Sequence, residues 1–84
     1  MIELQKILTL DTLEDNETAK VLKIETDNDI KRRLWDLGLT QNAKITRIGT
    51  SPLGDPIAFM IKNTVIALRI VNCRQITVEK LVPN

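Results

Sequence analysis

The chain has 84 residues, 43% of them hydrophobic, with 12 basic and 11 acidic side chains and a formal net charge of +1. This length and composition predict one small domain, residues 1–84, whose hydrophobic core needs no disulfide or metal. Because the chain is almost neutral and has only Trp35 and Phe59 as aromatic residues, we expect neither nucleic-acid binding nor insertion into a membrane.

The first half of the chain predicts a bend, a strand and a helix. Leu10 to Leu13 indicates a one-turn helix or tight bend, and the imperfect alternation of residues 18–26 is typical of a half-buried strand. Short polar residues at 26–29 then precede apolar side chains at helical spacing, which predicts a helix from about Asp29 to Leu37. Gly38 can adopt the left-handed backbone that ends a helix, so that Leu39 folds back on the last turn.

The second half is rich in β-branched residues and predicts four short strands. They are expected at 43–48, 57–61, 64–70 and 76–78 with its flanks, and residues 81–84 are expected to form a loose tail. Asn63 stands between two of these strands, where asparagine tolerates the positive φ of a tight hairpin turn. The predicted fold class is therefore mainly β: a small barrel of about five strands with one short helix inserted after the first strand.

The segment 51–56, Ser-Pro-Leu-Gly-Asp-Pro, predicts a rigid loop between two strands. Two prolines fix φ and restrain the residues before them, while Gly54 permits the turn. Leu53 at the tip has two alternatives: it folds inward onto the barrel, or it offers an apolar contact to a partner. Arg69, after an apolar strand, is expected to be buried against a carboxylate such as Asp55 or Asp36.

The predicted helix carries a basic pair, Arg32 and Arg33, and the chain's one tryptophan, Trp35. The pair is either a solvated helix face or a partner contact, because it lies off the apolar stripe. Trp35 is also off that stripe, which leaves an exposed interface anchor and packing over the barrel rim as alternatives.

Catalytic and metal-binding patterns are weak in this sequence. It has no histidine, which is the commonest general base and transition-metal ligand, and the lone Cys73 lies among apolar neighbours, as a buried structural thiol does. Glu14, Asp15 and Glu17 fall in one turn, where solvated surface is the ordinary interpretation. We therefore predict a binding module without cofactor, not an enzyme.

The compartment is indicated by the cysteine count and by the first residues. A single cysteine cannot form an internal disulfide, which fits a reducing cytoplasm. Charged residues interrupt the segment from Met1 to Leu13, so it resembles neither a signal peptide nor a membrane span. The expected localisation is cytoplasmic.

In their order and spacing, several short motifs resemble the FeoA family, small cytosolic accessory proteins of bacterial ferrous iron uptake with an SH3-like barrel. They are Leu10-x-x-Leu13, Ala19-x-Val21, Arg32-Arg33-Leu34 with Leu37-Gly38-Leu39, Pro52-Leu53-Gly54-Asp55-Pro56, and Ala67-Leu68-Arg69 before Ile76-x-Val78-Glu79. Asn16, Asn42 and Asn63 stand where this family usually has glycine, which preserves left-handed turns at those positions. Asn72 and Cys73 replace the usual acidic residue and alanine of the family.

The resemblance implies docking to FeoB, the membrane transporter of ferrous iron, on its cytosolic side. The residues expected to contact this partner are Arg32, Arg33, Trp35, Leu53, Gly54, Asp55 and Pro56, while Asn16, Gly38, Asn42 and Asn63 are expected to serve as turns or caps. Related domains are associated with transition metals, but the lack of histidine argues that this chain need not bind iron itself.

The alternative function is a free-standing SH3-like regulatory module related to the C-terminal domain of metal-dependent repressors. Such a module would act through protein contacts or weak transition-metal binding. The chain lacks the DNA-reading helices of those repressors, so it would act in trans. The strand edges of an open barrel also permit homo-oligomers.

Overall fold

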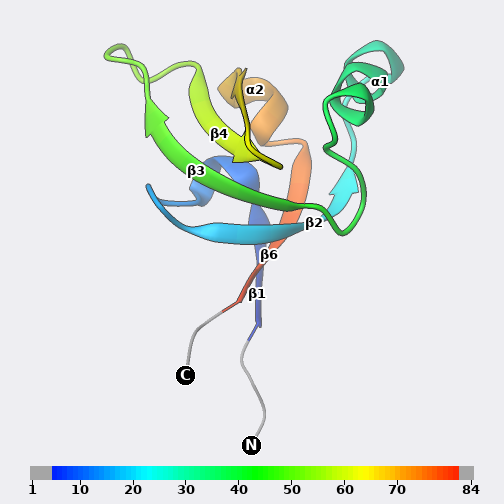
Figure 1. The fold of residues 1–84 in the computed structure, drawn as a ribbon, viewed down its shortest axis with the longest axis horizontal. Coiled ribbons are helices and arrows are strands. Elements are labelled where there is room, and N and C mark those ends of the chain that lie inside the picture. The colour runs from blue at the N-terminus through cyan, green and yellow to red at the C-terminus, as the bar shows by residue number, and fades with distance from the viewer. Residues whose placement is uncertain (1–4, 82–84) are drawn as a thin grey trace, which may run out of the picture.

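The computed structural model describes residues 5–81, in which antiparallel strands dominate (Figure 1). The elements in chain order are β1 (Gln5–Thr9), the 3-10 helix η1 (Leu10–Thr12), β2 (Thr18–Ile24), α1 (Asn28–Asp36), β3 (Lys44–Thr50), β4 (Ile57–Ile61), β5 (Thr64–Leu68), α2 (Ile70–Cys73) and β6 (Ile76–Leu81). In this part of the chain, no helix has both the length and the apolar character needed to cross a membrane.

The six strands form one sheet in the order β1-β6-β2-β3-β4-β5, and every neighbouring pair is antiparallel. The register shifts between Val21 and Lys23 on β2 and between Arg47 and Gly49 on β3, and such irregularities bend a strand. The sheet therefore curls, and Figure 1 shows β3 crossing the molecule above β2. Among residues 5–81 no pairing joins β1 to β5, so the curled sheet stays open at these two strands.

The curled sheet encloses one hydrophobic core. Its buried members are Leu10, Leu13, Ala19, Val21, Ile24, Leu34, Leu39, Ile45, Ile57, Phe59, Ile61, Ile66, Leu68, Cys73, Ile76 and Val78. On β4 the burial alternates along the strand, with Ile57, Phe59 and Ile61 inside and the two residues between them less buried. This alternation is the two-residue period of a strand with one face on the core.

Helix α1 begins and ends one residue before the predicted bounds of about Asp29 and Leu37, with a polar cap at its start and a glycine after its end. The Asp27 carboxylate accepts a hydrogen bond of 3.0 Å from the Ile30 N–H, which satisfies one of the free donors at the helix start. At the other end Gly38 has φ +99°, and the Leu39 N–H donates to the Leu34 carbonyl at 2.8 Å. Leu39 is thereby folded back into the core, where it is fully buried.

The left-handed backbone expected at three asparagines is present in the structure. Asn16, Asn42 and Asn63 have φ of 70°, 72° and 68°. Asn63 forms the β4–β5 turn with Lys62, whose φ of 46° is also positive, and two consecutive positive φ values define the tight hairpin turn that matches strand twist. Asparagine thus replaces glycine in these turns with little conformational cost.

The mainly β fold with a short inserted helix is confirmed, with six strands instead of about five. Neither β1, which consists of Gln5–Thr9 and pairs with β6, nor α2 was predicted from the sequence. Because β1 comes first, α1 follows the second strand and not the first. The strand expected at 64–70 ends at Leu68, and Leu81, expected in a loose tail, belongs to β6; residues 82–84 of that tail lie outside the described residues.

Candidate functional site

The loop between β3 and β4, residues 51–56, holds its own shape through three hydrogen bonds. The Ser51 N–H donates to the Pro56 carbonyl at 3.1 Å, the Gly54 N–H donates to the Ser51 carbonyl at 2.8 Å, and the Ser51 hydroxyl donates to the Asp55 carbonyl at 2.7 Å. Gly54 has φ +89°, which few other residues adopt. Leu53 at the tip is 94% exposed, so of the two alternatives left by the sequence, the one in which it folds inward is wrong.

Asp55 ties this loop to the second helix. Its carboxylate accepts a hydrogen bond of 3.0 Å from the Ile70 N–H at the first residue of α2. The Arg69 side chain is exposed and no ion pair joins it to Asp55 or Asp36, so the expectation that it is buried against one of them is wrong. The backbone N–H next to Arg69, and not its guanidinium, is what Asp55 contacts.

Helix α1 presents its predicted contact residues to solvent. Arg32 and Arg33 are exposed, and Trp35 is 53% exposed. Trp35 also lines a pocket of about 320 Å³ between α1 and β2, together with Val21, Leu22, Lys23, Ile24, Lys31 and Gln41. The tryptophan is therefore about half-exposed beside this pocket, and its role as an interface anchor stays a prediction.

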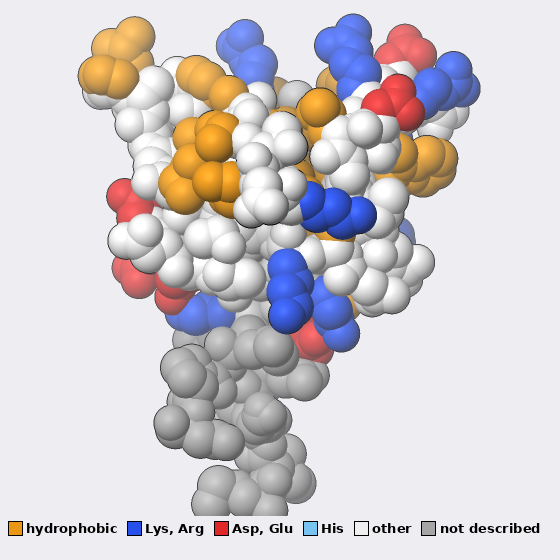
Figure 2. All heavy atoms as spheres, viewed as in Figure 1, with side chains coloured by type: hydrophobic (Ala, Val, Ile, Leu, Met, Phe, Trp, Pro, Cys, Tyr) orange, Lys and Arg blue, Asp and Glu red, His pale blue; other side chains and the backbone are white. Residues whose placement is uncertain are grey.

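The structure does not bring the two predicted contact regions into one patch. Figure 1 shows the 51–56 loop and α1 at opposite corners of the same end of the molecule, with α2 between them in this view. Hydrophobic side chains gather over β3 and β4 on the left of Figure 2, while charged side chains predominate over α1 on the right. A single partner that touches both regions must span the α2 side of the molecule.

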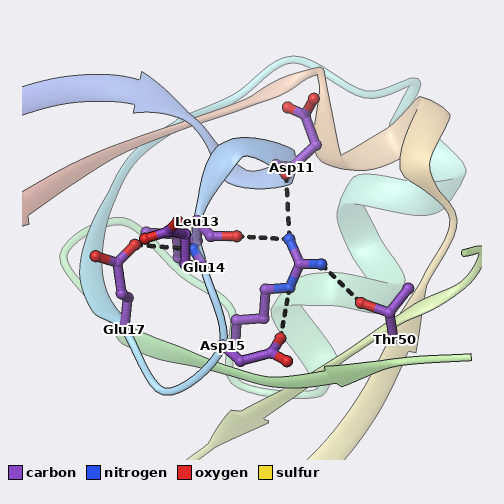
Figure 3. A network of polar contacts seen from close by, with 7 residues as sticks. Asp11, Leu13, Glu14, Asp15, Glu17 and Thr50 are labelled. Atoms are coloured by element: carbon purple, nitrogen blue, oxygen red, sulfur yellow. Dashed lines mark hydrogen bonds and ion pairs between the residues drawn. The ribbon is translucent and has the colours of Figure 1, made fainter.

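Arg47 on β3 organises the turn before β2, and sequence reasoning missed it (Figure 3). Its guanidinium donates to the Leu13 carbonyl at 2.5 Å and to the Asp11 carbonyl at 3.3 Å, to the Asp15 carboxylate at 3.1 Å, and to the Thr50 hydroxyl at 2.6 Å. The side chain is only 18% exposed. The one available sign was its position inside a β-branched strand, where a charged residue needs partners.

The acidic turn at residues 14–17 is mostly exposed, as a solvated surface is, and two of its carboxylates also form ion pairs. Asp15 pairs with Arg47, Glu17 pairs with Lys80, and the Glu14 N–H donates to a Glu17 carboxylate oxygen at 2.8 Å. These carboxylates are thus engaged by cations and by a backbone donor. Within residues 5–81 no group of three or more acidic or cysteine side chains is placed to hold a metal ion.

Cys73, on α2, is fully buried, and its Sγ lies 3.9 Å from the Leu68 carbonyl. Burial raises the pKa of its thiol to about 12, and the nearby carboxylates of Asp11 and Asp55 act in the same direction. Since the thiolate is the nucleophile, a higher pKa lowers reactivity at any given pH.

We expect Cys73 in the folded protein to resist thiol reagents. At pH 8, a pKa higher by about three units leaves roughly a thousandfold less thiolate than in an unfolded chain, and burial blocks access as well. The measurement is the rate of reaction with an aromatic disulfide reagent, with and without denaturant. A folded protein that reacts as fast as the denatured one would contradict this burial.

A curled open sheet of antiparallel strands with short surface helices is the architecture of a small SH3-like β domain. The FeoA domain model matches residues 8–80, and the chain belongs to the FeoA domain family. No curated protein sequence matches the chain.

Solved structures agree with this assignment. FeoA from Chlorobium tepidum is 31% identical, with a TM-score of 0.87 over 92% of this chain and 73% of that one. FeoA from Stenotrophomonas maltophilia, a complex with zinc described as a prokaryotic SH3 domain protein, is 29% identical, with a TM-score of 0.72 over 84% of this chain and 88% of that one. These neighbours confirm the predicted SH3-like fold.

The fold also occurs in a regulatory protein. A manganese-dependent transcriptional repressor is 17% identical, with a TM-score of 0.80 over 96% of this chain and 45% of the repressor. At this identity the likeness is one of fold alone.

Proposed function

We propose that this chain is a non-catalytic cytoplasmic accessory protein of ferrous iron uptake that docks to the cytosolic side of a FeoB-type membrane transporter. Membership of the FeoA family supports the role in iron uptake. The observation that carries the docking proposal is Leu53, 94% exposed at the tip of a loop that its own hydrogen bonds brace.

An exposed leucine on a braced loop favours binding for two physical reasons. Covering the side chain removes apolar surface from water, which stabilises a complex by roughly 1.5–3 kcal/mol for a leucine that becomes fully buried. The loop also loses little conformational freedom on binding, because its two prolines and its own hydrogen bonds already restrict it. Asp55 strengthens this effect by fastening the loop to α2.

Helix α1 supplies the second contact in this proposal. Trp35 offers a large half-exposed ring, and Arg32 and Arg33 offer charge-assisted hydrogen bonds to acidic groups of the partner. Such contacts modulate a transporter only if the chain binds one of its conformational or nucleotide states more tightly than another. The two regions together would let one chain bridge separate parts of the transporter's cytosolic surface.

We expect Leu53→Arg to weaken binding to the cytosolic domain of the FeoB transporter from the same source by at least about tenfold, without unfolding the chain. A charge at the loop tip is costly to bury, whereas in the free protein it stays in water. Calorimetric titrations with GDP and with a non-hydrolysable GTP analogue measure the affinity and its nucleotide dependence.

The matched control is Ile7→Arg, which places the same charge on an exposed apolar residue of β1, far from the loop in the sheet order. It should bind like the unchanged chain. Equal weakening by both variants would remove the loop from the proposed contact. If the unchanged chain binds in neither nucleotide state, the alternative of an SH3-like regulatory module acting in trans gains weight.

A further inference from the structure

Strand β5 lies at one end of the sheet, and β4 is its only paired neighbour among the described residues. Ile61 and Thr64 are the hydrogen-bonded pair that closes the two-residue turn. Along an antiparallel ladder, hydrogen-bonded pairs then alternate with pairs that are not hydrogen-bonded. With this alternation, the backbone N–H and C=O groups that point toward β4 are those of Thr64, Ile66 and Leu68. Val65 and Ala67 therefore direct their N–H and C=O groups to the free edge, where a further strand can pair with them.

The outer face beside this edge is apolar and hollowed. Val65 is 58% exposed, and Ala67 lines a groove of about 400 Å³ on the face of β3, β4 and β5. We call it the β3–β5 groove, and its lining residues are Ile48, Gly49, Thr50, Ser51, Pro56, Ala58 and Ala67. Ala58 and Ala67 are cross-strand partners, so two methyl groups form part of the groove wall and leave room for a larger apolar side chain.

Two cations flank the edge. Lys62 precedes β5 and Arg69 follows it, both are exposed, and within residues 5–81 neither forms an ion pair. Four other basic residues of the sheet are paired, in the bridges Lys20–Glu79, Lys23–Glu25, Arg47–Asp15 and Lys80–Glu17. Both ends of β5 therefore carry a cation that forms no ion pair in the described part of the chain.

This charge pattern disfavours a second copy of the chain as the occupant. If two β5 strands paired antiparallel through Val65 and Ala67, Lys62 of one chain would lie beside the second copy's Arg69 at both ends of the ribbon. Like charges so placed across a strand pair are destabilising. A segment with acidic side chains at these positions would instead gain two favourable contacts.

We propose that the free edge of β5 is a docking site for an extended acidic peptide segment of another protein. The segment adds a seventh strand by pairing with the backbone of Val65 and Ala67, places an apolar side chain in the β3–β5 groove, and sets one carboxylate near Lys62 and another near Arg69. Backbone hydrogen bonds supply affinity in such strand addition, while side-chain pockets and charges select the sequence. The groove adjoins the 51–56 loop through Ser51 and Pro56, but strand addition at the β5 edge does not depend on the transporter as partner.

The test uses a blocked heptapeptide with glutamate at both ends and alternating valine and threonine between them. Titrated into the isotope-labelled full chain, it should shift the amide signals of Val65 and Ala67 saturably. The same peptide with lysine at both ends should bind at least about tenfold more weakly. If neither amide responds to the acidic peptide, or if both peptides bind equally, the proposal is overturned.

Two variants locate the site. Ala67→Pro removes the outward N–H but no donor of the β4 ladder, and should abolish binding while the chain stays folded. Arg69→Glu should weaken binding of the acidic peptide and improve that of the lysine peptide, whereas Lys44→Glu, the same charge change at an exposed residue of β3, should alter neither. Undiminished binding by Arg69→Glu would refute the site even if Ala67→Pro fails to fold.

A dilution series of the chain without peptide tests for self-association. Concentration-dependent shifts of the Val65 and Ala67 amide signals would show an interface between two copies of the chain instead.

Discussion

Replacing Arg47 with alanine is expected to lower the free energy of unfolding by about 3 kcal/mol. Most of this loss of stability arises because the Leu13 carbonyl loses its charged donor in a site that is only partly open to water. The Asp11 carbonyl loses the same donor and contributes a smaller part. The ion pair with Asp15 adds little, because that carboxylate is 58% exposed. Chemical denaturation followed by circular dichroism measures the change.

Arg69→Ala is the matched control for Arg47→Ala. It removes the same guanidinium from an exposed position that has no ion pair with Asp55 or Asp36, and the free energy of unfolding should stay within about 0.5 kcal/mol of the unchanged chain. Arg47→Lys keeps the charge but not the forked donor set, so an intermediate loss is expected. If Arg47→Ala is as stable as Arg69→Ala, the arginine network does not hold the turn before β2.

Replacing Phe59 with alanine is expected to cost about 4 kcal/mol of unfolding free energy. Phe59 is the chain's one phenylalanine and is fully buried on β4, with Ile57 and Ile61 on the same face of the strand. Removing its ring leaves a cavity that a small curled sheet closes only in part. A chain of this length has roughly 4–13 kcal/mol in total, so the loss is a large share of its stability.

Val71→Ala provides the comparison for Phe59→Ala, because Val71 is an exposed apolar residue of α2, and it should change stability by less than about 0.5 kcal/mol. Should Phe59→Ala not fold, Phe59→Leu gives a smaller measurable loss of about 1.5 kcal/mol. A stable Phe59→Ala protein with an unchanged denaturation midpoint would contradict the central place of this ring in the core.

The separation of the surfaces constrains how any partner binds. The 51–56 loop and α1 lie at opposite corners of one end of the molecule, and Asp55 fastens the loop to α2 between them (Figure 1). A change that releases Asp55 from the Ile70 N–H would therefore loosen the loop without altering Leu53 itself. The predicted contact residue Asp55 thus has a structural role in the free protein.

The sequence by itself determined the features that depend on neighbours along the chain. Gly38 and Asn63 marked turns because few other residues tolerate positive φ, and the short polar residues at 26–29 marked the start of α1. The structure then identifies Asp27 as the cap, whose carboxylate accepts from the Ile30 N–H. The strand predicted at 57–61 from its β-branched residues has the same bounds as β4. The family motifs also placed the candidate loop and helix before any geometry was known.

Only the tertiary structure decided what depends on residues distant in sequence. Arg47 finds three of its four acceptors more than thirty positions earlier, and β1 pairs with β6 from the other end of the chain, so no local pattern reports either. The exposure of Leu53 likewise depends on loop hydrogen bonds that the residue types alone do not specify. Turns and caps are local because one residue's own backbone or side chain satisfies them, whereas burial, ion pairing and free sheet edges exist only once the strands have met.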